Sequence, residues 1–220
     1  MSSGLSRGRT LDPGEIGILW EDLPPFDQSG ATRLDPRTWF PHPERPFEFE
    51  IGSGKGTFLL QQSQLEPEVN YLGCEWAGEF YRYAADRLRR NQVRNVKLLY
   101  GDATEFMRWW MADGCVRVVH LYFSDPWPKS RHHKRRVVQD ASLREFHRVL
   151  EAGGELRLVT DHDELWAWYE EHAARHGELF ERLPFERPAS AAEGEVVGTN
   201  FERKYRREGR PFHAMTLRKR

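Results

Sequence analysis

Five acidic residues in the middle of the chain have the spacing and the neighbours expected of a site for a small cationic ligand. They are Glu50, Glu75, Asp102, Asp125 and Asp161. A carboxylate attracts an ammonium or sulfonium group and repels a phosphate. An acid at the end of a second strand can also accept hydrogen bonds from both hydroxyls of a ribose. The pattern therefore favours a nucleoside-like ligand that carries no phosphate.

The first of these acids begins the glycine-rich segment EIGSGKG, residues 50–56, with glycines at Gly52, Gly54 and Gly56. Glycines after a strand let the backbone turn tightly and approach a ligand closely. A P-loop would need Ser or Thr after the lysine, and a dinucleotide fold would need the third glycine one residue later. S-adenosylmethionine (SAM) carries a sulfonium and an ammonium and suits Glu50 better. A purely structural turn remains the alternative.

Two further acids are placed to hold the adenosine of such a ligand. Glu75 can accept from the ribose hydroxyls, and Trp76 beside it offers a flat face to the base. Asp102, followed by Ala103, can accept from the adenine amino group. Taken singly, Glu75 and Asp102 are also typical of helix N-termini. Together with Glu50 they favour SAM over NAD or ATP.

The segment SDPWPKSRHHKRR, residues 124–136, joins an acidic corner to a run of positive charge. Two prolines fix the backbone around Trp127, which is either a wall of a substrate pocket or a core tryptophan under a turn.

We call residues 129–136 the cationic segment. Its members are Lys129, Ser130, Arg131, His132, His133, Lys134, Arg135 and Arg136. Most charge runs are solvated surface, but this one adjoins the corner and is expected to begin the next helix, where cations oppose the helix dipole. Such a placement indicates a polyanion partner, and binding should weaken steeply with salt.

Strands alternate with helices from residue 46 onward. Expected strands cover 46–52, 70–76, 96–103, 116–125, 154–161 and 212–219, and expected helices cover 57–65, 77–92, 104–113, 137–150 and 164–176. This order predicts βαβ units and a parallel sheet. The five acids then follow the carboxyl ends of its strands, where ligands bind in such sheets. Residues 1–45 are expected to form an irregular N-terminal arm, pinned by Trp20, Phe26, Trp39 and Phe40, and residues 46–220 the catalytic domain.

Composition limits the remaining possibilities. The chain has 220 residues and a formal net charge of −1, so attraction for a polyanion must come from local clusters. Two cysteines offer neither a disulfide framework nor a zinc quartet, which favours the cytoplasm. No signal peptide or membrane helix is expected. The adjacent pair His132 and His133 lacks further ligands at metal-binding spacing, so no metal is expected.

The motifs EIGSGKG, GCEW, GDA, SDPWPKSRHHKRR, TDH and TNFE, in this order and spacing, resemble those of the bacterial tRNA (guanine-N7-)-methyltransferases. The resemblance covers roughly residues 40–220. Ser130 stands where a second lysine is usual, and Trp76 where the family often has an aliphatic residue. The resemblance implies a Rossmann-like class I methyltransferase fold, α/β, with a mostly parallel seven-stranded sheet and helices on both faces.

The resemblance also implies roles for individual residues. Glu50, the glycines, Glu75 and Asp102 would hold SAM, and Asp125 would lie beside the methyl donor as the catalytic residue. The substrate contacts would be Lys129, Asp161, Thr199, Asn200, Phe201 and Glu202, with the last four forming a loop over the guanine. The cationic segment would bind RNA. The expected target is N7 of a variable-loop guanine, position 46 in tRNA numbering.

Two other functions compete with this one. An amino-group methyltransferase acting on adenine would use a similar corner, but with tandem prolines, which DPWP lacks. A non-catalytic RNA-binding module on the same fold is opposed by the intact acids. The sequence leaves monomer and homodimer equally open.

Overall fold

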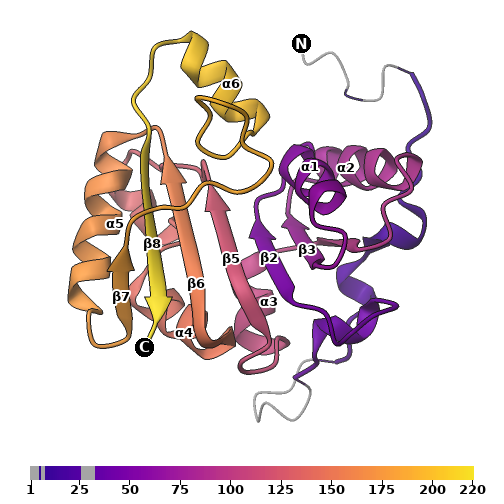
Figure 1. Ribbon diagram of the computed structural model, residues 1–220, viewed down its shortest axis with the longest axis horizontal. Coiled ribbons are helices and arrows are strands. Elements are labelled where there is room, and N and C mark those ends of the chain that lie inside the picture. The colour runs from indigo at the N-terminus through magenta and orange to yellow at the C-terminus, as the bar shows by residue number, and fades with distance from the viewer. Residues whose placement is uncertain (1–4, 6–7, 26–32) are drawn as a thin grey trace.

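The computed structural model describes residues 5, 8–25 and 33–220, and these residues form a central sheet between layers of helices (Figure 1). The strands are β1 Gly17–Ile18, β2 Phe47–Ile51, β3 Asn70–Glu75, β4 Val96–Tyr100, β5 Val116–Tyr122, β6 Leu150–Thr160, β7 Phe180–Leu183 and β8 His213–Lys219. The α-helices are α1 Thr57–Leu65, α2 Gly78–Arg90, α3 Ala103–Trp109, α4 Asp140–Val149, α5 Asp163–Arg175 and α6 Asn200–Arg207. Alternation of strands and helices after residue 46 is confirmed.

The strand order is β1-β4-β3-β2-β5-β6-β8-β7. Strands β1 to β6 pair in parallel, and β8 lies antiparallel between β6 and β7. Strands β2 and β5 are neighbours in the sheet but not in the chain, so the order reverses between them, and ligands bind beyond the carboxyl ends at such a point. The mostly parallel sheet is confirmed. It has eight strands instead of seven because Gly17–Ile18 of the arm pairs with β4.

Strand β2 is buried on both faces, and its side chains point alternately into two hydrophobic cores, one on each face of the sheet. Phe47 and Phe49 pack with residues of α3, α4 and α5. On the other face, α1 and α2 cover the sheet around Phe58 and Tyr71. Because successive side chains of a strand point to opposite faces, Glu50 lies on the face covered by α1.

The arm is anchored more regularly than expected. It contains three short 3-10 helices, and the buried carboxylate of Asp86 in α2 binds Arg9 at 2.9 Å. Three of the expected aromatic anchors make ring contacts with the domain, namely Trp20 with Trp110, Trp39 with Phe106 and Phe40 with Phe47. Phe26 lies outside the described residues. The division of the chain at residue 45 stays a prediction.

Trp20 lies directly against Gly101, which precedes Asp102 at the end of β4. A β-carbon at Gly101 would overlap the indole of Trp20. We expect Gly101→Ala to displace the tryptophan and lower the free energy of unfolding by about 1–3 kcal/mol. Urea unfolding measures this, with Gly177→Ala as control because its β-carbon would lie 3.6 Å from its nearest neighbour. Equal stability of Gly101→Ala and wild type would contradict the packing.

The start of β6 differs from expectation. A helix was expected to reach residue 150 and a strand to begin at 154, but β6 already begins at Leu150 and passes through both glycines, 153 and 154. A β-carbon at Gly154 would lie 3.0 Å from the carbonyl oxygen of Arg117 in β5. The glycines therefore allow close approach of the two strands, beside a register shift between Val116 and Val118.

Candidate active site

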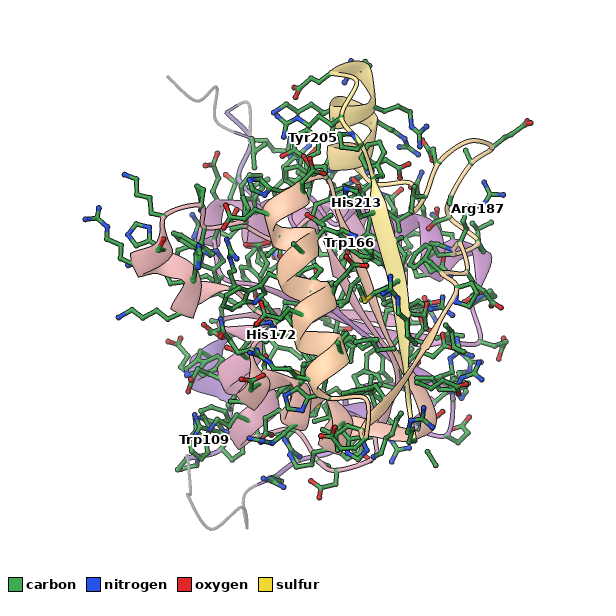
Figure 2. The ribbon with its side chains drawn as sticks, turned by 90° about the vertical axis from the view of Figure 1, so that its left-hand side faces the viewer. Trp109, Trp166, His172, Arg187, Tyr205 and His213 are labelled. Carbon is green, nitrogen blue, oxygen red and sulfur yellow. The ribbon has the colours of Figure 1, made fainter. Side chains whose placement is uncertain are left out.

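The acids at the carboxyl ends of the strands lie close enough to influence one another. Burial raises the pKa of Glu50 to about 8, and the carboxylate of Glu75 adds to the rise. Burial also raises the pKa of Glu75, and Asp125 adds to it. The pKa of Tyr205 in α6 is raised by burial, by Asp161 and, more weakly, by Asp125. Figure 2 shows Tyr205 above the N-terminal end of α5. Burial raises the pKa of Cys74, and both Asp102 and Glu75 add to that rise. The structure thus brings all five predicted acids to one edge of the sheet.

The glycine-rich loop turns through backbone conformations that favour glycine. Gly52, Gly54 and Gly56 have φ angles of 76°, 52° and 65°. The loop is tied to β3, since the N–H of Gly52 donates to the carbonyl of Cys74 at 2.9 Å and that of Gly54 to Glu75 Oε2 at 2.7 Å. A β-carbon at Gly52 would project into open space. The loop therefore leaves room beside the strand ends for a ligand.

Two buried glutamates of β2, on the same face, have opposite environments. Glu48 accepts from Arg117 at 2.5 Å and contacts His120 at 2.8 Å. Burial alone would raise the pKa of Glu48, but His120 and Arg117 hold it below its ordinary value. Glu50 Oε2 and the buried Ser53 Oγ make no hydrogen bond of good geometry among the described residues, although Ser53 lies close enough to lower the pKa of Glu50. Unlike Glu48, Glu50 has no cationic partner in the described part of the chain, and its carboxylate is free to pair with a cationic ligand.

Glu75 and Trp76 lie where the adenosine was expected. The two oxygens of Glu75 accept from the backbone N–H groups of Gly54 at 2.7 Å and Ala77 at 2.8 Å. These bonds orient the carboxylate, and each oxygen keeps a second lone pair for a hydroxyl donor. The indole of Trp76 is 69% exposed, which leaves a face free for a base.

Asp102 caps a helix, one of the two roles considered for it, and its contact with adenine stays a prediction. Its Oδ1 caps α3 by accepting from the N–H of Thr104 at 2.8 Å and of Glu105 at 3.1 Å. The hydrogen bonds of Asp102 within the described part of the chain all go to Oδ1, so Oδ2 can accept from an amino group. Ala103 is buried at the first position of α3.

The corner after β5 holds Asp125 between two strained positions. Phe123 and Trp127 have φ angles of 55° and 44°, a left-handed region that non-glycine residues seldom adopt. Asp125 itself is exposed. Trp127 is half-buried, with the guanidinium of Arg135 4.9 Å above its ring and His132 edge-on at 5.8 Å. It belongs to neither core cluster, which favours a pocket wall over a core tryptophan.

The cationic segment forms a separate 3-10 helix, Ser130–Arg135, and does not begin α4. The prediction that these cations oppose the dipole of the next helix was therefore wrong. That helix, α4, starts at Asp140 and has an acid in its first turn. The exposure of its members still suits a polyanion. The exposed side chains are Lys129, Arg131, Lys134 and Arg135, and those of His132 and His133 are half-buried.

Arg136 was predicted to bind RNA, but the structure places its side chain inside the protein. Its side chain is only 1% exposed. The guanidinium donates to Glu164 at 2.6 Å and to the carbonyl of Pro126 at 2.9 Å, and it stacks 4.8 Å above Trp168. A guanidinium occupied in this way is not available to a phosphate.

The TNFE motif begins helix α6 and is not a loop. Thr199 caps the helix by accepting from the N–H of Glu202 at 3.0 Å. Asn200 donates to Thr57 Oγ1 at 2.7 Å, and the half-exposed ring of Phe201 lies above Gly54. The motif therefore places α6 over the glycine-rich loop and the start of α1.

Glu202 differs from the expected substrate contact. Its side chain is fully buried. The carboxylate accepts from the N–H groups of Val196, Val197 and Gly198 and from Arg206. It organises the segment before α6 and does not face the open edge.

Of the remaining predicted substrate contacts, Lys129 is exposed at the start of the cationic segment. Asp161 follows β6 and accepts from Arg210 at 2.7 Å. Arg210 also lies 4.1 Å above the ring of Tyr205, so Asp161 and α6 are linked.

Comparison with known proteins gives the family. A family model described as "Putative methyltransferase" matches residues 44–215. The tRNA (guanine-N(7)-)-methyltransferase of Agrobacterium fabrum is 34% identical over 97% of this chain and 93% of its own. That of Streptococcus mutans is 32% identical over 80% and 82%. The chain belongs to the tRNA (guanine-N(7)-)-methyltransferase family. It is an enzyme of the methyltransferase class.

Solved structures agree on the fold. The aminoglycoside resistance methyltransferase NpmB1 superposes with a TM-score of 0.55 at 16% identity, covering 96% of this chain and 95% of its own. The antibiotic-resistance methyltransferase Kmr gives 0.52 at 19%, covering 80% and 87%. The Rossmann-like methyltransferase fold is thereby confirmed for this family member.

The described residues fit the cofactor that the family implies. Glu50 Oε2 and Ser53 Oγ, beside the open space at Gly52, offer acceptor oxygens to a ligand. Acceptor oxygens of this kind suit a sulfonium and an ammonium group. Within residues 5, 8–25 and 33–220, no three His, Cys, Asp or Glu side chains gather in a way that could hold a metal, and no helix has the length and apolarity needed to cross a membrane.

Several residues of this methyltransferase site were not predicted. Ser53 lies between two glycines and gave no signal of its own in the sequence. Thr57 and Tyr205 lie in helices whose sequence patterns indicate no function. Phe123 packs between Tyr205 at 6.0 Å and Phe212 at 5.8 Å, which couples α6 to the corner. Only the tertiary fold brings these residues together.

Proposed function

We propose that this family member transfers the methyl group of SAM to N7 of a variable-loop guanine in tRNA, position 46 in tRNA numbering. One observation carries the proposal. The buried Glu50 and Glu75 and the exposed Asp125 lie at or just after the ends of β2, β3 and β5, which are neighbours at the switch point of the sheet, and no cation of the described chain pairs with Glu50. A cationic ligand that spans this row of acids would present its reactive group at Asp125.

Residues of the chain would hold each part of the ligand. Glu50 and the glycine-rich loop would bind the charged end, Glu75 the ribose, and Trp76 with Asp102 the base. When bound, SAM supplies an electrophilic methyl group. The raised pKa of Glu50 means that the free enzyme holds a proton there near neutral pH, and a bound cation would displace it.

Guanine N7 carries an in-plane lone pair and no proton, so the reaction needs no base. The main requirement is a guanine held in line with the methyl group. Positive charge moves onto the purine ring as the bond forms, and a fixed carboxylate at Asp125 stabilises it. The same carboxylate can accept from guanine N1–H or the amino group, which would select guanine over adenine.

The tRNA would be bound by the exposed members of the cationic segment and by basic side chains of α6. Lys134, Arg135, Lys204 and Arg207 are exposed and can contact phosphates. Cys74 and Cys115 are free buried thiols, in keeping with a reducing cytoplasm. Monomer and homodimer remain open predictions.

Incubation of the enzyme with radiolabelled SAM and an unmodified tRNA transcript tests the proposal. We expect label on one variable-loop guanine, found by borohydride and aniline cleavage of the 7-methylguanosine. Label on adenine N6 would favour an amino-group methyltransferase, and tRNA binding without transfer would favour a non-catalytic module. Either result contradicts the proposal.

A further inference from the structure

Both chain neighbours of Asp125 are tied to the same helix, α5. On one side, Ser124 Oγ lies 2.8 Å from the hydroxyl of the buried Tyr169. On the other side, the carbonyl of Pro126 accepts from Arg136 Nε at 2.9 Å. Asp125 therefore lies between two anchors that lead to α5, one directly through Tyr169 and one through Arg136, which binds Glu164 of that helix.

The second anchor is an ion pair between the buried Arg136 and the half-exposed Glu164. Arg136 Nη2 lies 2.6 Å from Glu164 Oε1 in α5, and the guanidinium stacks on Trp168 of the same helix. Trp168 is itself fixed by donating from Nε1 to the carbonyl of Val138 at 2.7 Å. Removing a guanidinium from water costs free energy, which only a well-placed partner and further hydrogen bonds offset. The position of Arg136 indicates that its task is inside the molecule.

The corner also needs support because its backbone is strained. The left-handed φ angles of Phe123 and Trp127 lie on either side of Asp125, and non-glycine residues seldom adopt such angles. Strained positions persist only where surrounding contacts impose them. The bonds from Tyr169 and Arg136 reach the two residues between them that adjoin Asp125, and they add to the ring contacts that Phe123 and Trp127 make themselves.

We propose that Arg136, Glu164 and Tyr169 form a corner clamp, a set of positioning residues that holds the carboxylate of Asp125 in place for methyl transfer. The inference rests on the proposed function. Arg136 then positions the carboxylate of Asp125, whereas its exposed neighbour Arg135 binds the RNA. Figure 2 shows α5, the helix that carries Glu164 and Tyr169, along the side of the sheet that faces the viewer.

Two neighbouring arginines provide a matched test. In Arg136→Ala we expect kcat to fall about 10- to 100-fold, because small misplacement of a catalytic group has effects of this size. Its affinity for tRNA and the salt dependence of binding should equal those of wild type. In Arg135→Ala we expect weaker tRNA binding and a salt slope reduced by about one phosphate contact.

Tyr169→Phe keeps the clamp testable if Arg136→Ala fails to fold, since it removes one oxygen. It should lower kcat roughly 3- to 10-fold, as loss of one hydrogen bond would. Arg175→Ala is the control on α5, because its ion pairs with Asp140 and Glu171 are exposed. It should leave kcat unchanged.

Amide hydrogen exchange over residues 123–128 separates failure of the clamp from failure of the proposed function, because it does not depend on activity. We expect faster exchange there in Arg136→Ala and Tyr169→Phe, and wild-type exchange in Arg175→Ala. Unchanged exchange together with unchanged kcat in both clamp variants would overturn the inference. So would a loss of tRNA affinity in Arg136→Ala equal to that in Arg135→Ala.

Discussion

Replacing Glu50 by Gln is expected to abolish SAM binding and, at the same time, to stabilise the free protein. Loss of the charge opposite the ligand's cationic end should weaken SAM about 100-fold or more, because breaking a buried charge pair costs several kcal/mol. Isothermal titration of SAM measures this. For the wild type we expect SAM affinity to rise with pH up to about 8, as Glu50 loses its proton.

Glu50→Gln is expected to weaken SAM binding but to raise the free energy of unfolding of the free protein. Between the ordinary pKa of 4.5 and the folded value of about 8, the folded state holds a proton that the unfolded chain has released. Stability of the wild type therefore falls as pH rises through this window. Each unit of pKa difference is worth about 1.4 kcal/mol, so Glu50→Gln should gain a few kcal/mol over wild type at pH 8 and little at pH 5.

Glu48→Gln is the matched control for this prediction. Glu48 lies two residues away on the same face, but it is paired with Arg117 and His120. Removing its charge leaves those partners unsatisfied and should destabilise the protein in urea unfolding at pH 7. If Glu50→Gln were destabilised in the same way, or bound SAM normally, the assignment of Glu50 to the ligand would be wrong.

Replacing Asp125 by Asn is expected to lower kcat about 100- to 1,000-fold, the range found when a charge-stabilising group is lost. The reason is electrostatic, since Asn keeps the shape and the acceptor oxygen but not the charge. Single-turnover transfer with saturating tRNA and SAM measures the effect. Because no proton is removed from N7, we expect a solvent deuterium isotope effect close to one in the wild type.

Asp163→Asn is the control for Asp125→Asn, because Asp163 is an exposed carboxylate paired with His213 at the start of α5. Its kcat should match that of the wild type. A near wild-type turnover of Asp125→Asn with unchanged KM would show that Asp125 neither stabilises charge nor orients the guanine. A large isotope effect would indicate a proton-transfer role instead.

The positions of the acids could be predicted because they follow from topology. Strand–helix alternation puts Glu50, Glu75 and Asp125 at the same edge of a parallel sheet whatever the packing details. The conformation of the glycine-rich loop followed from residue type in the same way, since all three glycines adopt positive φ.

Side-chain direction was the part that could not be predicted. Arg135 and Arg136 are equivalent in sequence, and only Trp168 and Glu164 of α5 decide that Arg136 turns inward. Glu202 likewise turns toward three backbone N–H groups, which exist only once the preceding segment has folded around it. Trp20 contacts Gly101 through a packing between distant parts of the chain, which no local pattern encodes.

The most direct test of the central claim uses a tRNA transcript with 7-deazaguanosine at the target position. This base keeps the Watson–Crick edge of guanine and replaces N7 by a carbon that has no lone pair. We predict that the enzyme binds this transcript with wild-type affinity and transfers no label from SAM to it, whereas the unmodified transcript accepts one methyl group. Undiminished transfer to the 7-deaza transcript would contradict methylation at N7.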